Sequence, residues 1–141
     1  MKYVLDSNVA LKWVLAEPDS AKANALRDDF RNGIHELLTP DVLPVEVAHA
    51  LTRAERQGRI AVGDSEIFLT DVLTTCPALH SYLSLLQRAT EISSSLRIGV
   101  YDCLYIALAE REKCKLVTTD DRLVKNLQSQ FPFIMSLASL P

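Results

Sequence analysis

The amino-acid sequence predicts an α/β fold in which a five-stranded parallel sheet lies between two layers of helices. Short apolar runs typical of buried strands alternate along the chain with longer segments whose apolar residues recur at helical spacing. Strands separated by helices favour parallel pairing with right-handed crossover connections. The length of 141 residues and the hydrophobic content of 48% fit one domain, residues 1–141, with a single core.

Turn and cap residues delimit the elements of the first half of the chain. Ser7 or Asn8 can cap the first helix, and Pro18 stops it. Gly33 suits the end of the second helix, and Pro44 suits the first turn of the third. The predicted elements are a strand Tyr3–Leu5, a helix from Ser7 to about Ala16, a helix Ser20–Asn32, a strand Glu36–Thr39 and a helix Pro44–Gln57.

The second half continues the alternation of helices and strands. Asp64 and Asp121 are expected to cap helices, and Leu86, Ala89 and Ile92 recur at helical spacing. The predicted helices are Asp64–Leu73, Tyr82–Leu96, Tyr101–Lys113 and Asp121–Gln130. The predicted strands are Ala78–His80, Lys115–Thr118 and Phe133–Met135. We predict the strand order 3-2-1-4-5, which places the topological switch point between the first and fourth strands.

Four acidic residues fall where this topology would bring them to one edge of the sheet. Asp6 is the first residue after the first strand, and Asp120 follows the fourth. Glu46 lies in the first turns of the helix after the second strand, and Asp102 opens the helix that leads into the fourth. Ligands of open parallel sheets bind at the carboxyl ends of the strands. We therefore expect the four carboxylates to converge there.

Carboxylates gathered in one pocket repel each other, by about 4 kcal/mol per pair at 4 Å with an effective dielectric constant near 20. Either some of them are protonated or a cation neutralises them. No cluster of Cys and His accompanies them, which disfavours zinc, and an all-oxygen ligand set favours Mg²⁺ or Mn²⁺. Such ions promote phosphodiester hydrolysis, most fully when two bind together. The sequence therefore predicts a metal-dependent phosphodiesterase.

A purely structural role for these acids is the main alternative. The chain has 18 acidic residues, and Asp102 and Asp120 could simply cap helices. The combination is nevertheless informative, because Asp6 and Asp120 follow apolar strands, where a carboxylate has little structural purpose.

Net charge and cysteine content further narrow the class of protein and the compartment that we expect. The net charge of −3 argues against a simple DNA-binding module, so any nucleic-acid site must be local or must recruit cations. The three cysteines are odd in number and show no C-x-x-C spacing, which is typical of buried thiols in a reducing compartment. The N-terminus reaches Asp6 before any long apolar run, and no segment has the length of a membrane helix. We expect a cytoplasmic protein with no membrane contact.

Four short motifs, in order along the chain, resemble those of PIN-domain ribonucleases. They are VLDSN at residues 4–8, VEV at 45–47, YDCLYIALA at 101–109 and LVTTD at 116–120. The compact length resembles VapC-type toxins of bacterial toxin–antitoxin pairs. The resemblance implies a PIN-like three-layer α/β/α fold and a Mg²⁺- or Mn²⁺-dependent endoribonuclease that cleaves single-stranded or structured RNA.

The resemblance also assigns roles to individual residues. Asp6, Glu46, Asp102 and Asp120 would be the catalytic, metal-binding acids, with Asn8 and Thr118 as supporting residues that orient them. His49 stands where relatives often carry Asn, and we expect it to be solvated or hydrogen-bonded. The basic residues expected near the acidic edge are candidate RNA contacts: Lys12, Arg53, Arg122 and Lys125.

The partners implied by the resemblance are the RNA substrate, a cognate antitoxin protein and a second copy of the chain. Apolar residues of the first helix, Val9, Trp13 and Val14, suggest a homodimer interface, because one small core has limited room for them.

Two other classes of protein remain open: a phosphoryl-transfer α/β protein, of haloacid-dehalogenase or receiver type, and a non-enzymatic interaction module. A haloacid-dehalogenase phosphatase would carry a second Asp two residues after Asp6, where Asn8 stands. A receiver domain would add an early acid pair and a late strand-end Lys. A non-enzymatic interaction module of the same fold would need none of the four acids.

Overall fold

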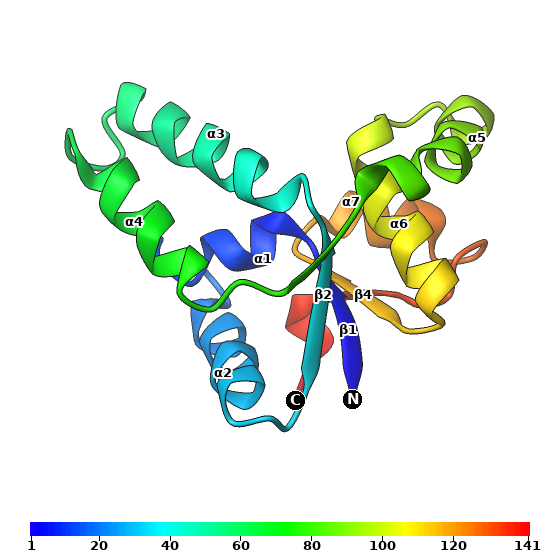
Figure 1. Ribbon diagram of the computed structural model, residues 1–141, viewed down its shortest axis with the longest axis horizontal. Helices are drawn as coiled ribbons and strands as arrows, with labels where there is room; N and C mark the ends of the chain where they lie inside the picture. Colours follow the sequence, from blue (N-terminus) through cyan, green and yellow to red (C-terminus); the bar gives the residue numbers. More distant parts are fainter.

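The computed structural model describes residues 1–141 as a parallel sheet between two layers of helices (Figure 1). The strands are β1 (Lys2–Leu5), β2 (Glu36–Pro40), β3 (Ala78–His80), β4 (Lys115–Thr118) and β5 (Ile134–Ser136). All four pairings are parallel, and the order is β3-β2-β1-β4-β5. The predicted fold class and strand order are confirmed. The central strand β1 pairs with β2 on one side and β4 on the other.

Seven α-helices and two 3₁₀ turns connect and cover the strands. The helices are α1 (Ser7–Leu11), α2 (Ser20–Arg31), α3 (Leu43–Arg56), α4 (Asp64–Leu73), α5 (Leu86–Leu96), α6 (Val100–Glu112) and α7 (Asp121–Leu127). The 3₁₀ turns are η1 (Tyr82–Ser84) and η2 (Leu137–Ser139). In Figure 1, the α3–α4 pair and the α5–α6 pair lie on opposite sides of the carboxyl ends of β1 and β2.

The three central strands, β1, β2 and β4, bury both faces, because neighbouring residues of a strand point to opposite sides of the sheet. Tyr3 and Leu5 of β1 pack in a cluster with the helices α1 to α4, whereas Val4 packs in a second cluster with α5, α6 and α7. Leu116 and Val117 of β4 divide between the clusters in the same way. This two-sided burial explains why the strands have continuous apolar sequences.

Several predicted boundaries and caps are wrong in detail. The first helix ends at Leu11 instead of continuing to about Ala16, and the segment Tyr82–Leu96 divides into η1 and α5. Ser7 is the first residue of α1 and Asp64 the first of α4, so neither is a cap; Asn8 also lies within α1. The cap of α7 is Asp120, whose Oδ1 accepts a hydrogen bond from the Leu123 backbone at 3.1 Å, so Asp121 is not the cap.

The expected dimer interface on the first helix is also not available. Val9 and Trp13 are buried within the chain itself, and Val14 packs against the same cluster. The Trp13 indole donates a hydrogen bond to the Ala23 carbonyl at 3.0 Å, and the Arg27 guanidinium lies 4.7 Å from the ring centroid. The chain turns after Leu11, and the turn places this large ring against α2. These apolar residues therefore offer no argument for a dimer.

The helices give little indication of a membrane span. No single helix is both long and apolar enough to cross a membrane; α5 and α6 pass by length and composition only when joined, and they are bent by 120°. The most apolar part of α6, Cys103–Ala109, is buried against the sheet and α5. Packing inside the protein therefore accounts for the apolar composition of α6.

Candidate active site

Asp6 lies at the centre of the candidate site, directly after the central strand. Its backbone N–H donates to the Val117 carbonyl at 3.1 Å, which extends the pairing of β1 with β4 by one residue. Only 4% of the residue is exposed. The main chain of the sheet thus holds this carboxylate at the carboxyl edge, in an environment that is costly for a charge unless donors compensate it.

The Thr118 hydroxyl provides the hydrogen bond that most strongly offsets the burial of the Asp6 charge. It donates to Asp6 Oδ2 at 2.9 Å and accepts from the Asp120 backbone N–H at 3.1 Å. It also accepts from the Asn8 amide at 3.2 Å. One fully buried hydroxyl therefore connects the end of β4 to Asp6, to Asn8 and to the start of α7.

Asn8 completes this network from the first turn of α1. Its Nδ2 group donates to Asp6 Oδ2 at 3.3 Å, and its Oδ1 atom accepts from the Thr119 backbone N–H at 3.0 Å. Ser7 Oγ lies 3.4 Å from Asp6 Oδ1. The Asp6 carboxylate is thus contacted on both oxygens, and its orientation is restricted by the ends of β1 and β4.

Glu46 approaches from the other side, in the first turn of α3. Its Oε1 atom accepts a hydrogen bond from the Tyr105 hydroxyl at 2.5 Å. Tyr105 is buried on α6, one helical turn after Asp102. Burial, followed by the charges of Glu46 and Asp6, raises the pKa of Tyr105 far above its ordinary value, so the phenol remains a donor.

Electrostatic coupling connects all four predicted acids. The pKa of Asp6 is raised to about 7, mainly because burial disfavours the charged form; the Thr118 hydrogen bond opposes the rise, and the charges of Asp102 and Glu46 add to it. Burial and then the charge of Asp102 raise the pKa of Glu46. Burial and then the charge of Asp120 raise the pKa of Asp102. For Asp6, Glu46 and Asp102, the charge of a neighbouring carboxylate disfavours ionisation.

The side chains do not form a closed metal cage as they stand. No group of three or more His, Cys, Asp or Glu side chains is close enough together to hold an ion. Their chemistry nevertheless suits a hard divalent cation, since they offer carboxylate oxygens and their mutual repulsion would be relieved by positive charge. Mg²⁺ commonly binds through one or two carboxylates and keeps several water ligands, so a tight protein cage is not required.

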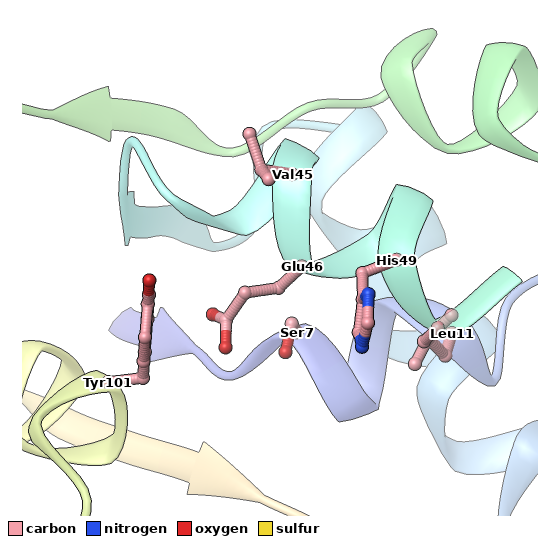
Figure 2. A pocket seen from close by; sticks show the side chains of 7 residues that line it. Ser7, Leu11, Val45, Glu46, His49 and Tyr101 are labelled. Carbon is pink, nitrogen blue, oxygen red and sulfur yellow. The ribbon is translucent and has the colours of Figure 1, made fainter. Parts of the chain in front are cut away.

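A cavity of about 570 Å³ opens beside Glu46. Figure 2 shows Glu46 and His49 pointing from α3 toward Ser7 on α1, with Tyr101 of α6 across from Glu46. A second hollow of about 350 Å³ shares Val45, Glu46 and Tyr101 with the first and continues between α3 and the α5–α6 pair. Glu46 therefore adjoins a largely apolar groove with an exposed aromatic ring, that of Tyr101.

The predicted basic contacts are placed unequally. The Lys12 ammonium lies 3.8 Å from a Glu17 carboxylate oxygen, and its side chain is only 12% exposed, so little of it is available to RNA. Arg53 on α3 is exposed, as are Arg122 and Lys125 on α7, and none of the three forms an ion pair. His49 is exposed, as expected, and makes no side-chain hydrogen bond within the chain.

Sequence reasoning missed the contribution of Tyr105, and it considered the tyrosines as base-stacking surfaces without singling out Tyr101. The signal for Tyr105 was its spacing from Asp102, since residues three apart share a face of a helix. Its hydroxyl is also the one strongly polar side-chain group in the buried run Cys103–Ala109. Tyr101 had no comparable signal, because its exposure depends on how α3 and α6 are spaced.

The comparisons with known proteins agree with this fold. The chain is 29% identical over 138 residues to "Ribonuclease VapC3" of Pyrobaculum aerophilum, covering 96% of this chain and 99% of that one. It is also 29% identical over 129 residues to "Ribonuclease VapC9" of Mycobacterium tuberculosis, covering 92% and 94%.

Two solved structures share the fold at low sequence identity. The crystal structure of PAE2754 from Pyrobaculum aerophilum has a TM-score of 0.74 at 17% identity, covering 99% of this chain and 85% of that chain. The crystal structure of VapBC2 from Rickettsia felis bound to a DNA fragment from their promoter has a TM-score of 0.65 at 18% identity, with 96% and 97% covered.

A family model for the PIN domain matches residues 3–127, a span that includes β1 from Tyr3 onward, the whole of β2, β3 and β4, and all four candidate acids. Because this match covers most of the chain, the protein belongs to the PIN domain family.

Proposed function

We propose that this protein is a divalent-metal-dependent endoribonuclease that acts as the toxin of a toxin–antitoxin pair. The observation that carries the proposal is the buried Asp6 carboxylate, which receives hydrogen bonds from Thr118 and Asn8 and is electrostatically coupled to Glu46 and Asp102. The names of the two curated relatives, both ribonucleases, support the same activity.

The four acids would share the binding of Mg²⁺ or Mn²⁺. Such a cation would supply Lewis-acid stabilisation for the hydrolysis of a phosphodiester bond. Asp6 would provide a fixed ligand, because Thr118 and Asn8 hold its carboxylate before any ion arrives. Glu46 and Asp102 are only half-buried, and Glu46 borders the open cavity, so these side chains would be able to adjust to the ion and to the substrate.

The groove beside Glu46 suits single-stranded RNA. Unpaired bases are commonly bound by stacking on aromatic side chains, and Tyr101 presents an exposed ring there. Arg53 and Arg122 are exposed cations without internal partners and could contact phosphates. The net charge of −3 is compatible with this, because neutralising the acids with metal makes the local potential more favourable to RNA.

The direct test is cleavage of a fluorescently labelled single-stranded RNA by the purified chain. We expect cleavage with Mn²⁺ or Mg²⁺, none in excess chelator, and recovery when the metal is restored. Glu46→Gln and Asp102→Asn should each lower the rate, with Arg59→Gln, on the surface near Glu17, as a folded control. Chelator-resistant cleavage would contradict the metal mechanism, and an inert wild-type chain with no metal-linked change in melting temperature would favour an interaction module.

A protein antitoxin is the proposed regulator. The groove between α3 and the α5–α6 pair has mostly apolar walls and ends at Glu46, so it can receive an apolar segment that carries one basic residue. An Arg or Lys inserted among the acids would replace the metal charge and block the site. Co-expression with the product of an adjacent small gene should abolish RNase activity, whereas free activity in the purified complex would contradict inhibition.

A homodimer remains a proposal that the relatives' family suggests, now without the support of Val9, Trp13 and Val14. Light scattering at micromolar concentration should report twice the chain mass. A monomer at that concentration would contradict it.

A further inference from the structure

Tyr105 is a buried side chain to which the proposed catalytic mechanism assigns no role. It is 1% exposed and packs in the core cluster of α5, α6 and α7. A phenylalanine would fill the same space, whereas a buried tyrosine hydroxyl requires a hydrogen-bond partner. The partner here is not a main-chain carbonyl within the core but Glu46 Oε1, at 2.5 Å, on a different helix 59 residues away in the chain.

We propose that Tyr105 is a positioning residue, whose hydroxyl holds the Glu46 carboxylate toward Asp6 and Asp102 before a metal ion binds. This inference rests on the proposed function, because it assigns Glu46 to a metal centre. It concerns orientation only; Tyr105 is not itself a ligand.

The surroundings of Glu46 explain why such a donor is needed. The negative charge of Asp102 lies close enough to raise the pKa of Glu46, so the two carboxylates repel each other. Glu46 also borders the cavity of about 570 Å³, into which its flexible side chain could swing and become solvated. Among the hydrogen bonds of the structure, the one from Tyr105 is the only side-chain contact that holds it at the acid cluster. Losing it should let Glu46 move away from Asp102.

The hydrogen bond also leaves part of Glu46 available. Tyr105 occupies Oε1, and Oε2 has no partner within the chain. One turn of α6 thus carries Asp102, a candidate ligand, and Tyr105, the group that orients a second candidate ligand from α3. Partners that orient metal ligands in this way typically change metal affinity or activity about 10–100-fold when they are removed.

Tyr105→Phe tests the role by removing only the hydroxyl. The primary measurement is the affinity for Mn²⁺ alone, by isothermal titration calorimetry without RNA. We expect affinity about 10–100-fold weaker than in the wild type. Tyr3→Phe is the matched control, because Tyr3 is also buried but its hydroxyl makes no hydrogen bond to an acid; its Mn²⁺ affinity should stay unchanged.

A double-mutant cycle separates orientation from packing. If Tyr105 acts through Glu46, the effect of Tyr105→Phe on Mn²⁺ affinity should vanish in a Glu46→Gln background. A purely structural role would lower stability in both backgrounds and leave Mn²⁺ affinity unchanged in the folded fraction. In cleavage assays, Tyr105→Phe should require more metal for half-maximal rate, and saturating metal should restore most of the rate.

Should Tyr105→Phe fail to fold, two non-natural residues at position 105 take its place. A 4-aminophenylalanine restores a donor and should retain affinity, whereas 4-fluorophenylalanine fills the space without donating and should lose it. Equal Mn²⁺ affinities for the wild type and the donor-free variants would overturn the positioning role while leaving the ribonuclease proposal intact. A wild-type chain that neither binds Mn²⁺ nor cleaves RNA would overturn both.

Discussion

The candidate active site has two halves that are built differently. On the sheet side, Asp6, Asn8 and Thr118 form a dense hydrogen-bond network at the ends of β1 and β4. On the groove side, Glu46 has a single side-chain partner, and His49 and Tyr101 are exposed. On the proposed function, the sheet would hold its acid in a fixed orientation, whereas the helices would provide an adjustable surface for ions, RNA or a protein partner.

This contrast has a physical origin. Main-chain pairing fixes the ends of neighbouring strands, so side chains at those ends inherit defined distances. Side chains on separate helices depend on how the helices pack, and here α3 and α6 are separated by a groove. We therefore expect substitutions in the sheet half to change both the free energy of unfolding and the cleavage rate. Substitutions in the groove half should affect mainly the binding of metal, RNA or a protein partner.

The largest expected effect is on catalysis by Asp6→Asn. The change removes the charge of a proposed metal ligand in the sheet half but keeps the shape of the side chain. We expect the RNA cleavage rate in Mn²⁺ or Mg²⁺ to fall by at least about 100-fold, with the circular dichroism spectrum unchanged. Full activity in this variant would refute the central role of Asp6.

Thr118→Val should have the next largest effect, on the free energy of unfolding. It replaces a fully buried hydroxyl with a methyl group and leaves Asp6, Asn8 and the Asp120 backbone N–H each short of one partner. We expect a loss of about 1–3 kcal/mol by urea denaturation. His49→Ala, in the groove half, is the comparison and should change the free energy of unfolding by less than about 0.5 kcal/mol. Equal effects at the two positions would contradict the division into two halves.

The pH dependence of stability in metal-free buffer should also reveal the buried carboxylate of the sheet half. The folded-state pKa of Asp6 is raised to about 7, above the unfolded value near 3.8. The folded state then binds more protons between these values, so stability should decrease as pH rises toward and through about 7. The slope from this one group is at most about 1.4 kcal/mol per pH unit.

Two variants and one ligand identify the source of that slope. Asp6→Asn should flatten it, and both Asp6→Asn and Asp102→Asn should raise the melting temperature at pH 8 because each relieves repulsion. Saturating Mn²⁺ should flatten the slope in the wild type. Melting temperatures that fall in both variants would mean that the acids are structural partners instead.

The smallest effect is expected in the groove, at Tyr101. Tyr101→Leu should weaken the binding of single-stranded RNA by about 5–150-fold, the range that corresponds to losing one aromatic stacking contact. Tyr101→Phe keeps the ring and should bind normally. Fluorescence anisotropy with Ca²⁺ in place of Mn²⁺ separates binding from cleavage. Lys12→Gln should have no effect, because the Lys12 side chain is largely buried and paired with Glu17. A large effect of this variant would show that RNA binds along α1 instead of the groove.

The sequence by itself determined the class of fold, the strand order and the positions of the four acids relative to the strands. These properties follow from local patterns: apolar runs define buried strands, turn residues separate the elements, and the topology of parallel strands places their carboxyl ends on one edge. The order of the motifs around Asp6, Glu46, Asp102 and Asp120 further narrowed the family, because four weak signals in a consistent order are rarely accidental.

Only the tertiary structure decided which side chains meet. The cap of α7 is Asp120 and not its neighbour Asp121, although both suit a cap by residue type. Trp13 faces Ala23 and Arg27 inside the chain instead of a second subunit, and Lys12 is engaged by Glu17. The Tyr105–Glu46 contact spans 59 residues and depends on the spacing of two helices. Such contacts depend on shifts of roughly a few tenths of an ångström in how the helices pack and on the choice of side-chain rotamer. Local sequence patterns encode neither of these.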